Sequence, residues 1–179
     1  MNTKIAQRPQ STSITSPKKM KFTVGSVSPL TSGACVAQFY SVAEAMCELG
    51  FRVFVLAEGD SNAQRCCFDL LEKYPENFEI LESVPASRTK ILNESDVVFF
   101  PAQPDKKMFQ EIISQKIVPV LPEECGVVNF DAQRETGEGF TFESGKIWSM
   151  VAALIRASEN KKFSYDWKNI QKNIENLKV

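Results

Sequence analysis

The chain has 179 residues, a size typical of one domain, and 43% of them are hydrophobic and 24% charged. Its net charge of -1 gives no overall field that would favour nucleic acid or an anionic membrane as partner. It contains no histidine, which excludes a Ser-His-Asp triad, a Cys-His pair, histidine-ligated zinc and a histidine general base supplied by this chain. No apolar run approaches the ~20 residues that a membrane helix needs.

Residues 1–20 differ in composition from the rest of the chain. They are rich in Ser, Thr and Pro, contain basic residues but no acid, and lack the apolar stretch of a signal peptide. We predict a disordered basic tail over 1–20 and one folded domain over 21–179. The five cysteines form no C-x-x-C motif, and together with the missing secretory signal this favours reduced thiols and a cytoplasmic location.

From Lys21 onward, short β-rich runs alternate with segments of helical periodicity. Strands are predicted at 21–27, 52–57, 78–84, 96–101, 117–121 and 139–143. Helices are predicted at 35–49, 63–74, 87–93, from about 106 after an Asp105 cap, at 145–160, and at 166–178 with Asp166 as cap. The run 52–57 lacks alternation, as expected of a strand covered on both faces. The fold class expected is therefore α/β, a single Rossmann-like, doubly wound and mostly parallel sheet.

Ligands of such a sheet bind at the carboxyl ends of its strands, so the loops there hold the candidate site. The loop 28–33 enters a helix, and Thr31, Ser32 and Gly33 could offer backbone N–H groups to a phosphate. Lys106 and Lys107 begin the helix after the fourth strand and could reach a diphosphate. The alternative for Thr31, Ser32 and Gly33 is an ordinary βα turn. The alternative for Lys106 and Lys107 is a solvated first turn of the helix.

Two further clusters are weighed against structural roles. Glu123, Glu124 and Cys125 follow the fifth strand, but adjacent carboxylates raise the pKa of a thiol, which argues against an activated nucleophile. A structural or solvated role is favoured, and we expect neither a metal site nor a catalytic residue here. Aromatic side chains also gather near the C-terminus, and packing is favoured over stacking on a sugar or base. They are Trp148, Phe163, Tyr165 and Trp167.

The segment 137–173 resembles bacterial glycogen and starch synthases. Gly137, Gly139, Phe140 and Phe142 match a Gly-x-Gly-Phe-x-(Phe/Tyr) strand of that family. The run 152–157 then matches its A-A-L-x-R-A helix, and 165–170 matches its Y-D-W-K-N-(I/L) helix start. The resemblance extends over about 21–178 and is clearest after Ser95. It implies the C-terminal, donor-binding domain of a GT-B glycosyltransferase, whose two Rossmann-like domains close on a nucleotide-sugar.

The departures from this family concern its chemistry. The family has an Arg and a Lys in the loop after its first strand, where this chain reads SVSPLTSG. It also has paired glutamates after the strand matching 96–101, where this chain has Gln103 near the first and Gln110 near the second. A glutamine lacks the negative charge, and losing two cations removes several charge-assisted contacts to a diphosphate.

The sequence therefore predicts a glycosyltransferase-like domain that is catalytically incompetent alone, with residual nucleotide-sugar or glycan binding and no resident cofactor. The alternative is an active subunit of a split glucosyltransferase using ADP- or UDP-glucose and a glucan acceptor. An unrelated NAD-type or flavodoxin-like protein is disfavoured because G-x-G-x-x-G is missing. If the stripe of the last helix is open, we expect a homodimer or a complex with a separate N-domain protein. That stripe is Trp167, Ile170, Ile174 and Leu177.

Overall fold

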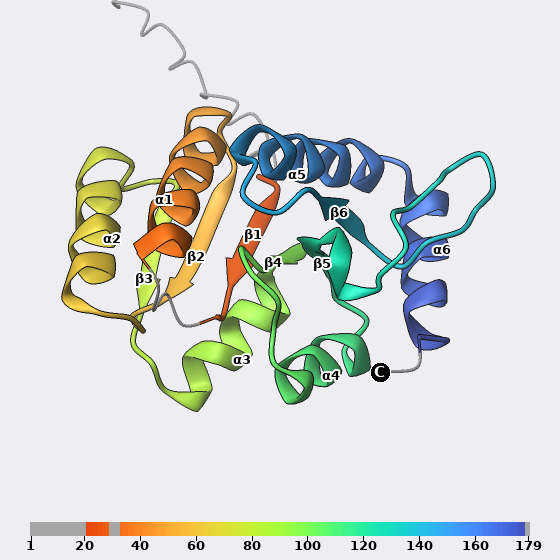
Figure 1. Cartoon of the computed structure of the whole chain (residues 1–179), viewed down its shortest axis with the longest axis horizontal. Helices are drawn as coiled ribbons and strands as arrows, with labels where there is room; N and C mark the ends of the chain where they lie inside the picture. The colour runs from red at the N-terminus through yellow and green to blue at the C-terminus, as the bar shows by residue number, and fades with distance from the viewer. Residues whose placement is uncertain (1–20, 29–32, 178–179) are drawn as a thin grey trace, which may run out of the picture.

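The computed structural model describes residues 21–28 and 33–177, and they form one α/β sandwich around a single sheet (Figure 1). The sheet order is β3-β2-β1-β4-β5-β6, and every neighbouring pair is parallel. The strands are β1 (Thr23–Ser26), β2 (Arg52–Leu56), β3 (Phe78–Leu81), β4 (Val97–Phe99), β5 (Val118–Pro122) and β6 (Phe140–Phe142). This confirms the predicted fold class, with strand bounds close to those expected. The expected tail over 1–20 lies outside the described residues.

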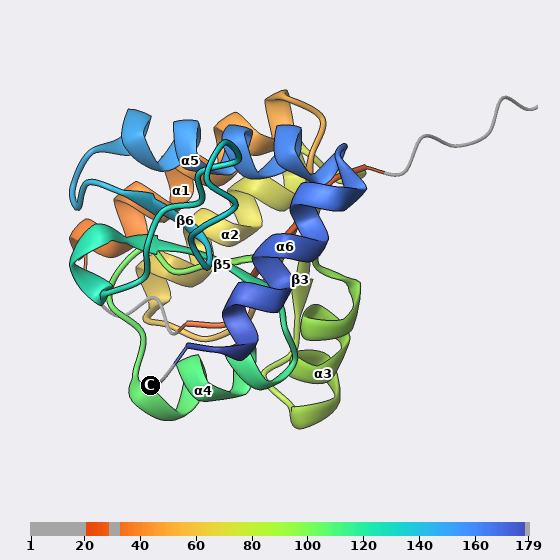
Figure 2. The same cartoon turned by 90° about the vertical axis from the view of Figure 1, so that its right-hand side faces the viewer.

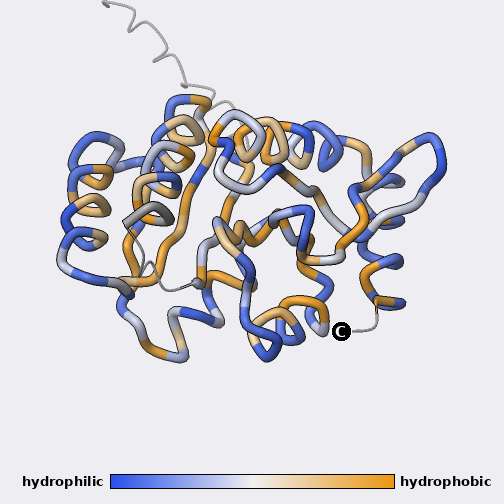
Figure 3. Tube along the Cα trace, viewed as in Figure 1, coloured by the Kyte–Doolittle hydropathy of each residue, from blue (hydrophilic) through white to orange (hydrophobic). Residues whose placement is uncertain are grey.

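Helices cover both faces of the sheet. They are α1 (Gly33–Glu48), α2 (Ser61–Lys73), α3 (Pro85–Glu94), α4 (Lys106–Ser114), α5 (Ile147–Lys161) and α6 (Ser164–Glu175). In β2, Val53 and Val55 belong to the core cluster under α1, α2 and α5, whereas Phe54 and Leu56 belong to the cluster under α3 and α4. The hydrophobic centre and polar rim are visible along the trace (Figure 3). The unbroken apolar run of β2 thus reflects burial on both sides.

Two helix starts show how well capping could be predicted. Asp105 caps α4 as predicted, because its Oδ1 accepts a hydrogen bond from the Met108 N–H at 2.9 Å. The prediction of Asp166 as a cap is wrong. Helix α6 begins earlier, at Ser164, because the Trp167 N–H already bonds to the Phe163 carbonyl at 3.0 Å. Asp166 lies in the first turn, where its charge faces the positive end of the helix.

The Gly-x-Gly pair before β6 is explained by close backbone packing. Gly137 has φ +102°, and a Cβ there would lie 2.6 Å from the Asn129 carbonyl oxygen. At Gly139, a Cβ would lie 2.6 Å from the Pro119 carbonyl oxygen of β5. Both positions therefore need glycine so that the loop 127–139 can lie against its neighbours.

The outer edge of β6 is occupied by side chains. The Asn129 Oδ1 accepts a hydrogen bond from the Thr141 N–H at 3.0 Å. The Arg156 guanidinium donates a hydrogen bond to the Thr141 carbonyl oxygen at 2.8 Å. Together they satisfy both backbone groups of the middle residue of β6.

Helix α6 packs on its own domain, where it runs along the side of the molecule from α5 toward α4 (Figure 2). Ile170 and Ile174 are fully buried and Trp167 is nearly so, and Leu177 packs against the cluster under α3 and α4. The stripe is therefore not open, and the condition on which association through it was expected is not met. The apolar surface is used internally because α5 and β5 cover it.

Truncating the centre of this stripe tests the docking of α6. We expect Ile170→Ala to lower the free energy of unfolding by about 2–5 kcal/mol, because it leaves a cavity in a fully buried site. Urea denaturation measures this change. The matched control is Lys168→Ala on the exposed side of the same helix, with an expected change within about 0.5 kcal/mol. Equal effects of the two variants would show that α6 is not docked.

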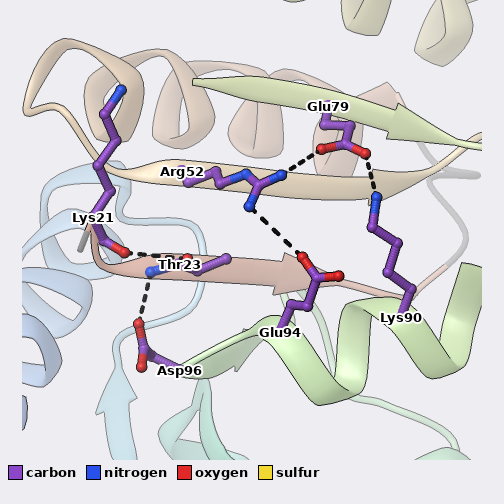
Figure 4. Close-up of polar contacts among 7 residues, drawn as sticks. All are labelled: Lys21, Thr23, Arg52, Glu79, Lys90, Glu94 and Asp96. Atoms are coloured by element: carbon purple, nitrogen blue, oxygen red, sulfur yellow. Dashed lines mark hydrogen bonds and ion pairs between the residues drawn. The ribbon is translucent and has the colours of Figure 1, made fainter. Parts of the chain in front are cut away.

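A network of ion pairs lies near the amino ends of the strands and links β2, β3 and α3 (Figure 4). Arg52 is 2.8 Å from Glu79 and 3.6 Å from Glu94, and Lys90 is 2.6 Å from Glu79. The Arg52 guanidinium also lies 4.3 Å from the centre of the Phe54 ring, which it covers. Partial burial raises the pKa of Glu79, but the hydrogen bonds from Lys90 and Arg52 outweigh it and hold that pKa below its usual 4.5.

This lowered pKa predicts a loss of stability in acid. As the pH falls below about 4.5, the unfolded chain takes up a proton at Glu79 before the folded chain does, so the free energy of unfolding decreases. We expect Glu79→Gln to be less stable than the wild type at neutral pH. As the pH falls below about 4.5, the variant should lose stability less steeply than the wild type. Urea denaturation at a series of pH values measures both effects. Glu76→Gln, at an exposed site just before β3, should keep the wild-type dependence of the free energy of unfolding on pH. An equally weakened dependence in Glu76→Gln would contradict the assignment of this effect to Glu79.

Candidate functional site

The strand order places a topological switch point between β1 and β4. From β1 the chain proceeds to β2 and β3 on one side, and from β4 it proceeds to β5 and β6 on the other. In open α/β sheets, ligands bind at the carboxyl edge beside such a switch point, and we call this expected place the crevice. The Ser28 hydroxyl after β1 lies 3.6 Å from the Met108 Sδ in α4, which joins the two walls.

Three of the five predicted phosphate-binding residues lie at helix starts on the carboxyl edge of the sheet. Gly33 is the first residue of α1, and Lys106 and Lys107 are the first two residues of α4, both exposed. Thr31 and Ser32 lie outside the described residues. The fold thus brings the starts of α1 and α4 to one edge, from segments far apart in the sequence. Phosphate binding by these residues stays a prediction.

A cavity of about 210 Å³ opens beside the start of α4, between the segments that follow β4 and β5. Lys106 lies at it and Lys107 does not, so the two lysines are not equivalent. Sequence reasoning missed Phe109, Val127 and Leu177 as cavity residues, because apolar periodicity alone assigns them to the core. The full lining is Gln103, Pro104, Lys106, Phe109, Cys125, Gly126, Val127 and Leu177.

The charge at this edge is mixed, with more acids than bases. In the segments 57–62, 82–86, 100–107, 123–126 and 143–148 the cations are Lys106, Lys107 and Lys146, and the acids are Glu58, Asp60, Glu82, Asp105, Glu123, Glu124 and Glu143. The excess of acids gives this edge no overall attraction for a diphosphate. An anion would depend on local contacts, such as Lys106 and a helix N-terminus, and not on the overall field.

The Glu123–Cys125 segment forms a single 3-10 turn after β5. The Ser144 hydroxyl donates to the Glu124 carboxylate, and this bond lowers the pKa of Glu124, helped by a backbone hydrogen bond. Burial raises the pKa of the Cys125 thiol to about 11, and the Glu124 charge adds to this effect. The predicted direction is correct, but burial is the larger cause. A thiol with this pKa is not an activated nucleophile.

The raised pKa predicts slow alkylation of Cys125. With iodoacetamide, the rate at Cys125 should keep rising with pH toward about 11, because the thiolate is the reacting form. Peptide-resolved mass spectrometry separates Cys125 from the other cysteines. We expect Glu124→Gln to raise its rate by less than about tenfold, since that carboxylate is the smaller cause and tenfold equals one pKa unit. A rate that levels off near neutral pH would contradict this.

The C-terminal aromatic residues divide into buried and exposed ones. Trp167 is 5% exposed and packs as predicted, whereas Trp148 is 81% exposed. Phe163 and Tyr165 are also exposed, so the packing prediction is wrong for three of these residues. The Tyr165 hydroxyl donates to the Glu135 carboxylate at 3.2 Å, which ties the loop 131–136 to α6.

No family model matches the sequence, and no curated protein matches it. Solved structures do share its fold. A glycosyltransferase from Rickettsia africae has a TM-score of 0.64 at 15% identity over 89% of this chain and 43% of its own. TarM of S. aureus, solved with Fondaparinux, α-GlcNAc-glycerol and UDP, has a TM-score of 0.62 at 17% identity over 88% of this chain and 33% of its own. The C-terminal domain of a group 1 glycosyltransferase, LpcC from Francisella tularensis, has a TM-score of 0.59 at 12% identity over 87% of this chain and 83% of its own.

These likenesses concern the fold. The sheet with its helices matches one Rossmann-like domain of a GT-B glycosyltransferase. The chain spans less than half the length of the Rickettsia and S. aureus proteins that it matches. A narrower assignment to glycogen or starch synthases stays a prediction. In the part of the chain that the structure describes, no helix is both long and apolar enough to cross a membrane.

Proposed function

We propose that this chain is a glycosyltransferase-like domain that binds a nucleotide-sugar at the crevice between β1 and β4 and does not transfer the sugar on its own. The observation on which the proposal rests is the composition of the wall formed by 101–111. Gln103 lies at the cavity. In the family that the sequence resembles, the first of the paired glutamates stands near this position. A neutral amide cannot stabilise the positive charge that develops in glycosyl transfer.

The two carboxylates of this wall, Asp105 and Glu111, are engaged elsewhere. Glu111 is the one acid in α4, and it pairs with Arg88 of α3 at 2.8 Å. Asp105, just before α4, is held as the helix cap. Neither acid is therefore free to act on a sugar in the crevice, which supports the loss of catalysis.

Nucleotide binding is supported by what the domain retains. The starts of α1 and α4 lie at one edge with Lys106 beside a cavity, and helix N-termini favour phosphate. TarM, which shares the fold, was solved with UDP. We infer that a uridine or adenosine diphosphate-sugar binds here, with its diphosphate near Lys106 and Gly33.

A second candidate is the active subunit of a split glucosyltransferase. It is favoured by the short coverage of the Rickettsia and S. aureus chains, of which this chain matches 43% and 33%. A separate protein would then supply the acceptor wall, exclude water and orient the sugar.

Calorimetry and an activity assay test the proposal together. We expect UDP or ADP to bind and NAD not to bind, and no glucosyl transfer from ADP-glucose or UDP-glucose by the pure chain. Lys106→Ala should weaken nucleotide binding by about ten- to a hundredfold, a charge-assisted contact to phosphate being worth ~1.5–3 kcal/mol. Lys168→Ala, an exposed lysine of α6, is the control and should leave binding unchanged.

Two outcomes would contradict the proposal. If neither UDP nor ADP binds at millimolar concentration, the domain has lost its donor site. If the pure chain transfers glucose above background and the double variant Lys106→Ala/Lys107→Ala abolishes the transfer, the chain is an enzyme by itself.

A further inference from the structure

The cavity beside the start of α4 has apolar walls from three separate segments. Phe109 belongs to α4, Val127 to the segment after β5, and Leu177 to the residues that follow α6. Phe109 is 8% and Val127 5% exposed, so the core holds both walls in place. A Cβ placed at Gly126 would meet no atom within 4 Å, so the space beside this residue is open.

The lining carries one positive charge. Of the described residues that line the cavity, Lys106 is the charged one, and no carboxylate is among them. The acids that adjoin the lining in sequence are engaged with other groups, since Asp105 caps α4 and Glu124 accepts a hydrogen bond from Ser144. The Cys125 thiol is neutral at physiological pH, because burial raises its pKa to about 11. The charge of Lys106 is therefore unopposed within the cavity.

The volume of the cavity, about 210 Å³, limits the size of a ligand. An apolar protein cavity of ~150 Å³ is large enough to bind benzene. Sites for drug-sized ligands occupy ~300–1,000 Å³. The cavity therefore has room for a single aromatic ring with a small substituent.

We propose that this cavity binds a small aromatic carboxylate. Its ring would pack against Phe109, Val127 and Leu177, and its carboxylate would form a charge-assisted hydrogen bond with the Lys106 ammonium. A neutral ring of the same shape would leave Lys106 unmatched, and a cationic ring would be repelled by it. The inference goes beyond the proposed function, because it requires no nucleotide, although both use Lys106.

The Cys125 thiol reports on occupancy, because it lines the cavity. At about pH 9, where some thiolate is present, we expect ~10 mM benzoate to slow the alkylation of Cys125 by iodoacetamide about tenfold, as a Kd of ~1 mM requires. Sodium chloride at the same concentration should have no such effect. Cys66 on α2 is not part of the lining and should react at an unchanged rate. Tandem mass spectrometry gives both rates from one sample.

Charge and shape are tested separately by calorimetry. Lys106→Ala should weaken benzoate binding about tenfold or more, because it removes the charge-assisted contact. Lys146→Ala removes an equal charge from the same edge without altering the lining, and should leave the affinity unchanged. Leu177→Trp keeps Lys106 but fills the cavity, and should abolish binding. Benzamide and benzylamine should bind much more weakly than benzoate to the wild type.

Three results would overturn the inference. They are no protection and no binding by benzoate at ~10 mM, equal binding by benzamide, and unchanged benzoate binding in Lys106→Ala. Nucleotide binding is measured separately and distinguishes this inference from the proposed function. If UDP and ADP fail to bind while benzoate binds, the proposed function is wrong and the aromatic-carboxylate site stands. If a nucleotide binds while benzoate does not, the reverse holds.

Discussion

The structure depends on one constraint, the burial of a parallel sheet on both faces. In β2 and β4, successive side chains enter opposite core clusters, Val53 against Phe54 and Val97 against Val98. Neither face can be left in water, so each connection must supply a helix to one face or the other. The chain changes the direction of winding once, between β1 and β4. The position of the crevice follows from this change and needs no residue dedicated to it.

The residues that determine the fold are largely separate from those that would perform chemistry. Gly137 and Gly139 are required because a side chain would collide with Asn129 and Pro119. At these two glycines, the segment 137–173 resembles glycosyltransferases in residues that the packing requires. We propose that the wall formed by 101–111, with Gln103 at the cavity and Glu111 paired with Arg88, lacks the free carboxylates that a reaction would need. A fold can persist in this way while the function at its edge changes.

The sequence predicted the sheet well because strand burial is encoded locally, by short apolar runs with turn residues between them. The Asp105 cap was predictable for the same reason, since the cap and its partner are three residues apart. The Asp166 cap and the exposure of Trp148 were not. Both depend on where a helix begins and on what covers each of its sides, and these are set by distant segments. Trp148 and Trp167 look alike in sequence, yet α5 and α6 direct one to water and the other to the core.

The side chains along the outer edge of β6 limit how this domain can combine with others. An open strand edge invites another strand to extend the sheet, which leads to runaway polymerisation or fibril growth. Here Asn129 and Arg156 already occupy the N–H and C=O of Thr141, so an incoming strand would have to displace a side chain from each. The sheet is therefore closed to growth at this end. An assembly at this end of the sheet must be joined through loops and helix surfaces, whereas β3 remains the other edge strand.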